Sequence, residues 1–289
     1  MATDPIVLNW LLEENNPGVR LRTLKALCKL PDNDVVVIAA RQLVTQTLPA
    51  ARDLSWMQLN GQVLTYNLTA LAESGLSRGD ILIEPVVDRL LAQPFDVNCG
   101  DMMLLRALVM LGFAADARVR DRISKMAELQ LPDGGWLCLH RLNKMKRIPK
   151  SCIKADMHGL LLAGELHKRG VNPWWSNSLM DYFRKRRLFY RTDDPTHLVL
   201  NCQPGYRMID IHIPIEFLRV GLPFLMEALA ESGQINTSEF REAFQLLEGK
   251  KDPQGRVYLE GTLAKSYLLK ERVGQPTKWG TLYTSLACG

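Results

Sequence analysis

The sequence predicts an all-α protein built from stacked helical hairpins. Apolar residues recur every three to four positions over most of the chain, which is the period of one helix face. Caps and glycines bracket these segments, and the alternation of apolar and polar residues that marks a strand is scarce. A single hairpin cannot bury both of its faces, so we expect several to stack. The pattern leaves open whether the stack is an open solenoid or a closed ring.

The N-terminal elements begin at recognisable caps. Asn16 is placed to cap a helix that has Pro17 at its first position. Asp34 is placed to start the next helix, whose apolar stretch covers residues 35–40. Together they predict a HEAT-like hairpin at about residues 8–47, within a single domain that spans residues 1–289.

Later segments continue the helical pattern. Gly112, Gly170 and Gly233 each follow an apolar periodic segment and are placed to end its helix. We expect Pro223 to kink the helix that contains it. The predicted helices lie within residues 79–91, 100–112, 116–130, 154–170, 214–233 and 237–249.

Composition limits the class of protein. The chain has 289 residues, of which 47% are apolar, enough for one substantial core. The N-terminus carries Asp4 and lacks the basic region of a secretory signal, and no window approaches the roughly 20 apolar residues of a membrane span. Six scattered cysteines are typical of free thiols. We therefore expect a soluble, cytoplasmic protein.

Basic residues are unevenly distributed along the chain. The stretch 141–154 holds six basic residues and no acid, and a second group follows Tyr182 at residues 184–191. Two interpretations stay open, because charge runs alone specify no partner. One is a solvated surface, and the other is a rim that attracts an anionic ligand.

A glycine-containing turn recurs in the chain. Residues 130–136 read Gln-Leu-Pro-Asp-Gly-Gly-Trp, and related Gly-x-Val turns occur at 61–63 and 255–257. We expect Gln130 to hydrogen-bond the backbone around the next turn and the glycines to permit a tight bend. We expect Trp136 to pack flat against the neighbouring hairpin. The turn is therefore predicted to join hairpins and says nothing about a reaction.

This turn resembles the glutamine-tryptophan turn of the squalene-cyclase and prenyltransferase superfamily. With NPGVRLRTLKALCKLP, DGGWLC, KSC, DPQGRVYLEG and VGQPTKWGTLYTSL, most of the chain looks like a bacterial group of prenyltransferase-like helical proteins. The resemblance implies an α/α toroid or partial toroid with a central cavity. It implies no particular activity.

The motifs of the superfamily's known chemistries are incomplete here. Class II cyclases, which are similar in fold, use an Asp-x-Asp-Asp acid, whereas residues 191–194 read Arg-Thr-Asp-Asp and precede Pro195, which favours a loop. Protein prenyltransferases hold zinc with Asp, Cys and His. Cys202, Asp210 and His212 only loosely resemble that set, because the expected aromatic residue and spacing are missing.

A different group of residues is the candidate catalytic site. Cys138 precedes the basic stretch, Cys152 lies near its end, and Asp156 and His158 follow at the start of the next helix. We expect Asp156 or Cys152 to act as an acid, His158 as its base partner and Cys138 as a polar cavity group. Linalool dehydratase-isomerase, another α/α toroid, is similar in using these residue types. The alternative is that the cysteines are buried small hydrophobes and that His158 packs on a helix face.

Other residues are candidates for binding. We expect Arg141 and Lys150 to contact an anion, and Trp136 and Tyr182 to form apolar walls of the substrate site. No resident cofactor is expected. If zinc is bound, its candidate ligands are Cys138, His140 and Cys152.

The leading functional hypothesis is a lyase, isomerase or cyclase that uses acid-base chemistry on a small, largely apolar substrate. That substrate is isoprenoid or anionic and lies in a central cavity. The alternative is a helical-repeat scaffold that binds nucleic acid or an acidic partner, with nucleic acid disfavoured. A zinc-dependent transferase is third, and a homodimer stays open.

Overall fold

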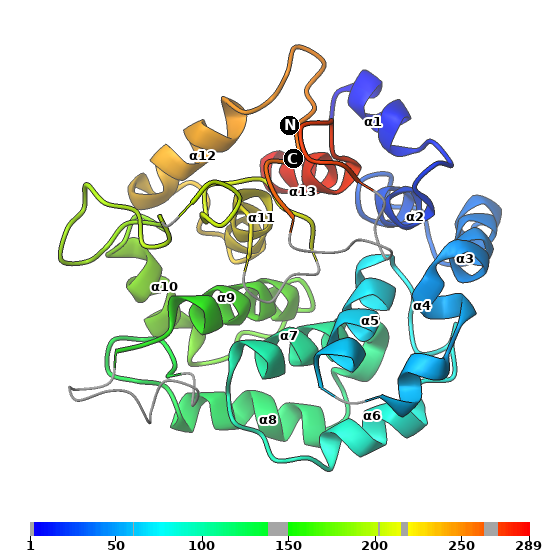
Figure 1. Ribbon diagram of the computed structural model, residues 1–289, viewed down its shortest axis with the longest axis horizontal. Coiled ribbons are helices and arrows are strands. Elements are labelled where there is room, and N and C mark those ends of the chain that lie inside the picture. The colour runs from blue at the N-terminus through cyan, green and yellow to red at the C-terminus, as the bar shows by residue number, and fades with distance from the viewer. Residues whose placement is uncertain (1–2, 60, 138–149, 202, 215–218, 263–270) are drawn as a thin grey trace.

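The computed structural model describes residues 3–59, 61–137, 150–201, 203–214, 219–262 and 271–289. Within these residues every regular element is a helix, and extended pairing is limited to two isolated bridges, Tyr190 with Leu198 and Tyr258 with Pro276. The helices form two concentric layers (Figure 1). The predicted all-α toroid is confirmed.

The inner layer of the described chain is a ring of six helices. Each packs against the next around the ring, from α5 through α7, α9, α11 and α13 to α2. Arg22 of α2 pairs with Glu73 of α5, and Gly18 lies against Ser74, so the ring is closed. The inner helices are α2 (Pro17–Ala26), α5 (Gln62–Glu73), α7 (Cys99–Leu108), α9 (Ile153–His167), α11 (Leu222–Glu231) and α13 (Lys278–Cys288).

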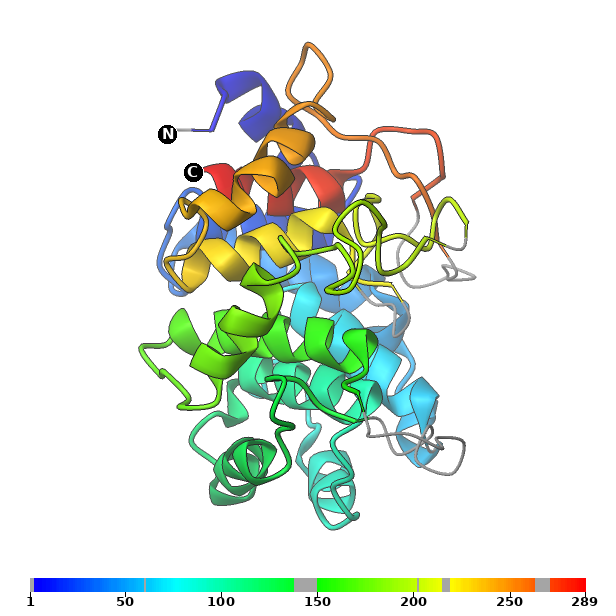
Figure 2. The same ribbon diagram turned by 90° about the vertical axis from the view of Figure 1, so that its left-hand side faces the viewer.

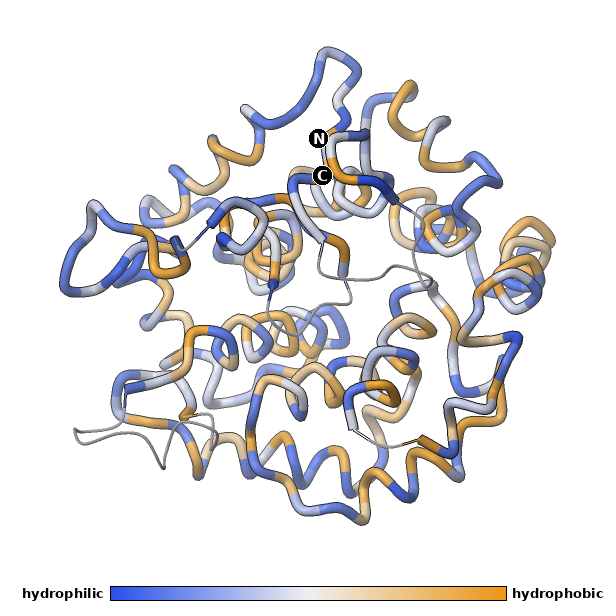
Figure 3. Tube along the Cα trace, viewed as in Figure 1, coloured by the Kyte–Doolittle hydropathy of each residue, from blue (hydrophilic) through white to orange (hydrophobic). Residues whose placement is uncertain are grey.

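The outer layer precedes the inner one, helix by helix along the chain. Apolar residues that recur every three to four positions make α6, α8 and α12 amphipathic helices with one buried face (Figure 3). The outer helices are α1 (Pro5–Leu11), α3 (Val35–Thr47), α4 (Pro49–Arg52), α6 (Glu84–Leu91), α8 (Ala117–Glu128), α10 (Ser176–Arg184) and α12 (Arg241–Glu248). Short 3₁₀ helices are η1 (Ser55–Gln58) and η4 (Ser238–Phe240), and the π-helical segment η2 (Val109–Phe113) directly follows α7.

Connections on the two sides of the ring differ in length. The segments that lead from an outer helix to the next inner helix reach the side of the ring where the inner helices begin. Three of these segments are long: 129–152, 185–221 and 249–277. Figure 2 shows the long connections gathered on one side of the ring. Long connections between the helices of a compact domain often carry function. This side is therefore where a site is expected.

Close packing in the inner ring depends on small residues. Residues Ala155–Leu166 of α9 are all buried, so this helix has no solvent face. A Cβ atom at Gly164 would lie 2.7 Å from the Cα atom of Ala228 in α11. The glycine thus lets the backbones of two inner helices approach closely.

Several predicted helix ends are confirmed. Asn16 and Asp34 cap α2 and α3 through their side chains. Gly112, Gly170 and Gly233 have φ angles of +98°, +73° and +67°, the left-handed conformation of a helix end.

Three helix predictions are wrong in detail. The helix predicted within residues 214–233 begins only at Leu222, and residues 219–221 are not helical. Residues 79–83 are not helical, because Asp80 accepts hydrogen bonds from Ser77 N and Oγ and forms a turn, and α6 begins only at Glu84. Pro223 does not kink a helix. It lies in the first turn of α11, where its missing N–H costs nothing.

None of the helices in the described ranges has the length and apolar character needed to cross a membrane.

Candidate active site

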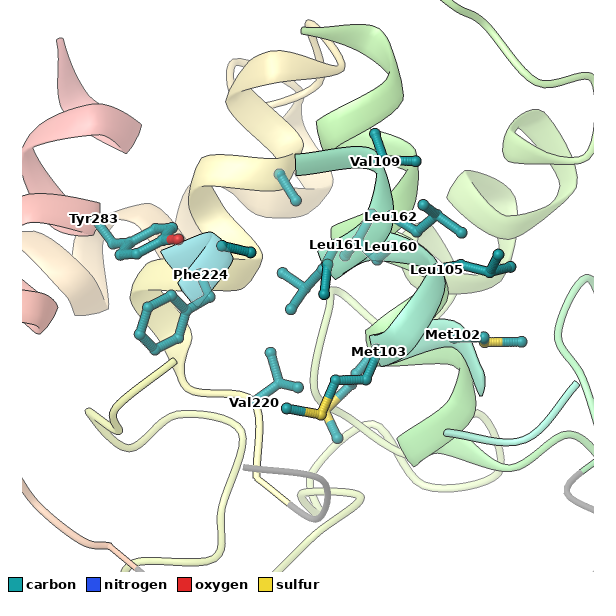
Figure 4. Packing of buried hydrophobic residues seen from close by; sticks show 14 of the residues in the cluster. Met102, Met103, Leu105, Val109, Leu160, Leu161, Leu162, Val220, Phe224 and Tyr283 are labelled. Carbon is teal, nitrogen blue, oxygen red and sulfur yellow. The ribbon is translucent and has the colours of Figure 1, made fainter. Parts of the chain in front are cut away.

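A small cavity lies inside the ring between α7, α9 and α11. Its open volume is about 10 Å³, room for about one water molecule. Figure 4 shows Met103, Leu161, Val220 and Phe224 directed toward this space, with Met102, Leu105 and Leu162 on the other side of their helices. The cavity is lined by Met103, Arg106, His158, Leu161, Ile213, Pro214, Arg219, Val220 and Phe224.

The polar groups of this cavity are all basic or neutral. Arg106 comes from α7, His158 from α9 and Arg219 from the connection before α11. Arg219 is buried, and its guanidinium lies over the ring of Tyr206 at 3.8 Å from the centroid. Among the described residues that line the cavity, none is an acid. We call Arg106, His158 and Arg219 the central triad.

Arg106 is fixed by a buried ion cluster. Its Nη1 atom lies 2.5 Å from Glu73 Oε1, and its Nη2 atom donates to the Tyr283 hydroxyl at 3.2 Å. Glu73 also pairs with Arg22 Nη1 at 3.2 Å and accepts from the Tyr283 hydroxyl. Burial acts to lower the pKa of Arg106, but Glu73, Tyr283 and more distant glutamates outweigh it and raise that pKa. Arg106 is therefore a permanent cation held in one orientation.

More charges extend this cluster across the ring. Glu165 of α9 pairs with Lys168 and Arg169, and Lys168 also lies 2.6 Å from Glu227 of α11. Burial favours the protonated form of Glu165, yet the neighbouring cations lower its pKa to about 2. Each inner helix supplies one member of this ionic layer: Arg22, Glu73, Arg106, Glu165, Glu227 and Tyr283.

Two long connections meet over the side of the ring where the cavity lies. Ile211 N donates to Glu260 Oε2 at 2.8 Å, and Glu260 N donates to Ile211 O at 3.0 Å. A Cβ atom at Gly261 would lie 2.5 Å from the Cα atom of Gly205, so the two backbones are in close contact. Ile213 and Pro214, which line the cavity, follow two and three residues after Ile211.

Asp156 lies in a different environment from His158. Its Oδ1 accepts the backbone N–H of Trp136 at 2.8 Å. Burial raises its pKa to about 7, against the opposing effects of that N–H and of the Tyr182 and Ser151 hydroxyls. Oδ2 makes no hydrogen bond of normal geometry within the described chain. Asp156 therefore anchors the turn before α9.

Positions 156 and 158 are two residues apart on a helix, so their side chains point about 200° apart. His158 lines the cavity and Asp156 does not. The structure thus does not bring the proposed acid and its base partner together.

The anchoring role of Asp156 has a counterpart elsewhere in the ring. Leu131 N donates to Gly135 O at 2.8 Å, and Asp252 N donates to Arg256 O at 2.7 Å, so the two glycine turns have the same backbone pattern. Val257 N then donates to Thr281 Oγ1 at 3.1 Å. Asp156 and Thr281 are each the fourth residue of their inner helix.

The predicted staple between hairpins is present. Gln130 Nε2 donates to Gly134 O at 2.8 Å and to Trp175 O at 3.0 Å. The Trp136 and Trp175 rings lie against each other with 82° between their planes, and flat packing of Trp136 against the neighbouring hairpin stays a prediction. A Cβ atom at Gly159 would lie 2.6 Å from the Trp136 ring, and this glycine makes room for the indole.

The remaining predicted site residues are dispersed. Cys152 is the buried N-cap residue of α9 and Lys150 is exposed. Trp136 is fully buried in the staple, and Tyr182 is buried beside Asp156. Their proposed catalytic and binding roles stay predictions. Cys138, His140 and Arg141 lie outside the described residues.

The segment compared with the cyclase acid motif and the residues compared with the prenyltransferase zinc site make local structural contacts. Asp194 accepts from Thr196 N and Oγ1 in an exposed turn. Asp210 accepts from Gly205 N, and both ring nitrogens of His212 lie 3.2 Å from backbone carbonyl oxygens. Cys202 lies outside the described residues. Within the described ranges, no group of three or more His, Cys, Asp or Glu side chains could hold a metal ion.

Part of the second basic stretch is already paired with acids. Arg184 pairs with Asp181 and Arg187 with Glu242. Arg186 lies over the ring of Tyr182 at 4.3 Å. These contacts favour the interpretation of the stretch as surface structure.

Arg106 and Arg219 were missed by sequence reasoning. Arg106 carried a usable signal, because it interrupts the apolar run Met102–Leu111, where an arginine is buried only if it is paired. Arg219 carried no comparable signal, because its segment was assigned to a helix.

No family model and no curated protein matches this chain. Among solved structures, it is similar to a polysaccharide lyase at 11% identity and a TM-score of 0.42, over 78% of this chain and 71% of the other. It is also similar to a glycosyl hydrolase of family 88 from Bacteroides vulgatus, at 8% identity and a TM-score of 0.48, over 98% of this chain and 89% of the other. Both likenesses are remote, so the candidate site rests on the residues of this chain.

Proposed function

We propose that this protein is a lyase or isomerase that moves a proton to or from carbon in a small substrate bound inside the ring. The main support for this proposal is the central triad. Its imidazole and two guanidinium side chains line one cavity, and the other residues that line it are apolar. Histidine is the side chain most often used for proton transfer near neutral pH. His158 is therefore the proton acceptor in this proposal.

In the lyase reaction, His158 takes a proton from a substrate carbon. The electron pair of the broken C–H bond forms a C=C bond, and a leaving group departs from the neighbouring carbon with its bonding electrons. An isomerase shares the first step and returns the proton to another carbon. The guanidiniums stabilise negative charge that develops on the substrate.

The cyclase alternative is less well supported. A cyclase of this kind needs an acid that faces an apolar cavity, whereas Asp156 accepts a hydrogen bond from the turn before α9.

The closed inner ring counts against the alternative of a helical-repeat scaffold. The inner ring is closed by the pairing of Arg22 with Glu73, and a helical-repeat scaffold would need an open concave face to hold a polymer. The structure of the described residues therefore favours the enzyme.

Deuterium exchange tests the proposal. Purified protein is incubated in D₂O with a panel of small hydroxy acids, unsaturated acids and neutral alcohols, and NMR follows loss of C–H signals and appearance of alkenes. We expect exchange or elimination with a member of the panel, reduced by about 10²-fold or more in His158→Gln. His197→Gln is the matched control, since His197 is exposed in a turn. Equal rates in wild type and His158→Gln contradict the proposal.

A further inference from the structure

A second pocket lies at the C-terminal end of α9, away from the cavity of the central triad. It is bordered by α8, by the last turn of α9 and by residues 171–175, which join α9 to α10. The long connections reach the opposite side of the ring, where the inner helices begin. We propose that this pocket binds a small aromatic carboxylate, with its ring against Trp174 and its carboxylate at Arg120. The site is independent of the proposed function.

The size of the pocket suits a small ligand. Its open volume is about 250 Å³. An apolar cavity of about 150 Å³ is large enough to hold benzene, so this pocket has room for a substituted aromatic ring. Pockets for drug-sized ligands have roughly 300–1,000 Å³, so a larger molecule would extend beyond it.

The floor and one wall of the pocket are apolar. Ile123, Leu166 and Trp175 line it and are buried, whereas Trp174 and Val171 line it and are 69% and 44% exposed. Exposed apolar side chains that gather around a hollow are typical of a binding site. The indole ring of Trp174 also offers a flat surface, on which another aromatic ring packs well. These residues therefore suit the aromatic part of a ligand.

The segment that carries Trp174 is held in place on both sides. Ser176 N donates to Pro173 O at 2.9 Å, which closes the turn around Trp174. The indole N–H of Trp175 donates to Ile123 O of α8 at 3.0 Å, which ties the segment to the other border of the pocket. A site whose walls are already ordered loses less conformational entropy when it binds a ligand.

The edge of the pocket on α8 is polar and positively charged. Arg120 and Ser124 are one helical turn apart, so their side chains lie on the same face of the helix. Asp116 and Asp121, the acids nearest to Arg120 along the chain, already pair with other basic residues. A guanidinium binds a carboxylate through two parallel hydrogen bonds, and a serine hydroxyl donates a further one. Charge complementarity at this edge therefore favours a carboxylate.

The balance of polar and apolar groups favours an aromatic ring over a sugar. Sugar hydroxyls that lose water need hydrogen-bond partners. Within the described residues that line the pocket, the side chains that carry a charge or a hydroxyl are Arg120 and Ser124. These two suffice for one carboxylate but leave the hydroxyls of a bound sugar ring unpaired.

Binding of phenylacetate tests this inference. Isothermal titration calorimetry of the full chain compares three probes: phenylacetate, phenylacetamide, which keeps the ring and lacks the charge, and glucuronate, which carries a carboxylate on a polar ring. We expect one phenylacetate to bind per chain, at least about tenfold more tightly than either other probe. An absence of saturable phenylacetate binding, or equal binding of the amide or of glucuronate, overturns the inference.

Variants then locate the bound ligand. Trp174→Ala and Arg120→Gln should each weaken phenylacetate binding by about tenfold or more, whereas Trp174→Phe should keep most of it. Arg118→Gln is the matched control for Arg120→Gln, because Arg118 is an exposed arginine of α8 that pairs with acids outside the pocket. Unchanged binding in Trp174→Ala or in Arg120→Gln overturns the inference.

Two further measurements separate this site from the alternatives. His158→Gln should bind phenylacetate as the wild type does, and loss of binding in that variant would place the ligand in the cavity of the central triad. Analytical ultracentrifugation should give the same sedimentation coefficient for the wild type and Trp174→Ala. A wild-type dimer that dissociates in Trp174→Ala would show that a second copy of the chain covers the pocket, and would overturn the inference.

Discussion

Asp156 has a structural role that its residue type alone does not reveal. A buried carboxyl with a pKa of about 7 has the property expected of a general acid. The same helix position in the other glycine turn is Thr281, which accepts an equivalent backbone N–H. This shared geometry shows that Asp156 anchors the turn before α9.

The raised pKa of Asp156 makes stability depend on pH. Between its ordinary value of 3.8 and about 7, the folded chain holds a proton that the unfolded chain has released. The folded state therefore binds more protons, and its stability falls as the pH rises through this window. Above about pH 7 the full cost of burying the carboxylate is present.

Asp156→Asn removes this cost and keeps an oxygen to accept the Trp136 N–H. We expect the free energy of unfolding of the variant, relative to wild type, to increase by roughly 2–4 kcal/mol between pH 4 and pH 8. Urea unfolding at the two pH values measures it. Thr281→Val, which removes the equivalent acceptor without a charge, should lose the same stability at both. A pH-independent difference for Asp156→Asn would show that the carboxyl does not titrate in this range.

At the scale of elements, glycines with positive φ angles allow the tight turns that join outer and inner helices. Gly134 has φ +97°, and a Cβ atom there would lie 2.2 Å from Ser178 O in α10. Gly170 has φ +73° with open space around it. The two positions share a backbone conformation and differ in their neighbours.

Substitution by alanine separates these two requirements. Gly170→Ala should cost about 1–2 kcal/mol, the strain of a left-handed alanine. Gly134→Ala adds a backbone clash and should cost clearly more, with the whole turn displaced. Chemical denaturation of both variants gives the comparison, and equal losses would show that the close approach to α10 is unimportant for stability.

At the scale of the whole molecule, the ionic layer closes the ring. Glu73 is buried between Arg22 and Arg106, and the Tyr283 hydroxyl donates to it. Buried pairs contribute little net stability against an apolar alternative, but removal of one partner leaves a buried charge uncompensated. The layer therefore sets which helices are neighbours more than it adds stability.

Glu73→Gln tests this layer. The variant leaves two buried guanidiniums without their carboxylate, and we expect a loss of about 3–5 kcal/mol. Asp121→Asn, in the exposed pair with Lys125, should change stability by about 0.5 kcal/mol or less. Urea unfolding measures both. Losses of similar size would mean that the buried cluster tolerates an unpaired cation.

Sequence reasoning recovered features that depend on neighbouring residues. The caps at Asn16 and Asp34 and the glycine ends at Gly112 and Gly170 follow from backbone hydrogen bonding within one turn. The Gln130 staple also followed, because its partners begin only four residues away. Pro223 was misjudged because a proline in a helix and a proline that starts one give the same local pattern.

The candidate site was recovered only in part, through His158. The hydrogen bond between Tyr283 and Glu73 joins residues separated by 210 positions, and Arg219 reaches the cavity from a segment that had been assigned to a helix. The sequence by itself determined the helices, their caps and the hairpin turns, since these depend on local backbone geometry and apolar spacing. The tertiary structure alone decided that the ring closes and which charges face its cavity, because those contacts form only when distant helices pack together.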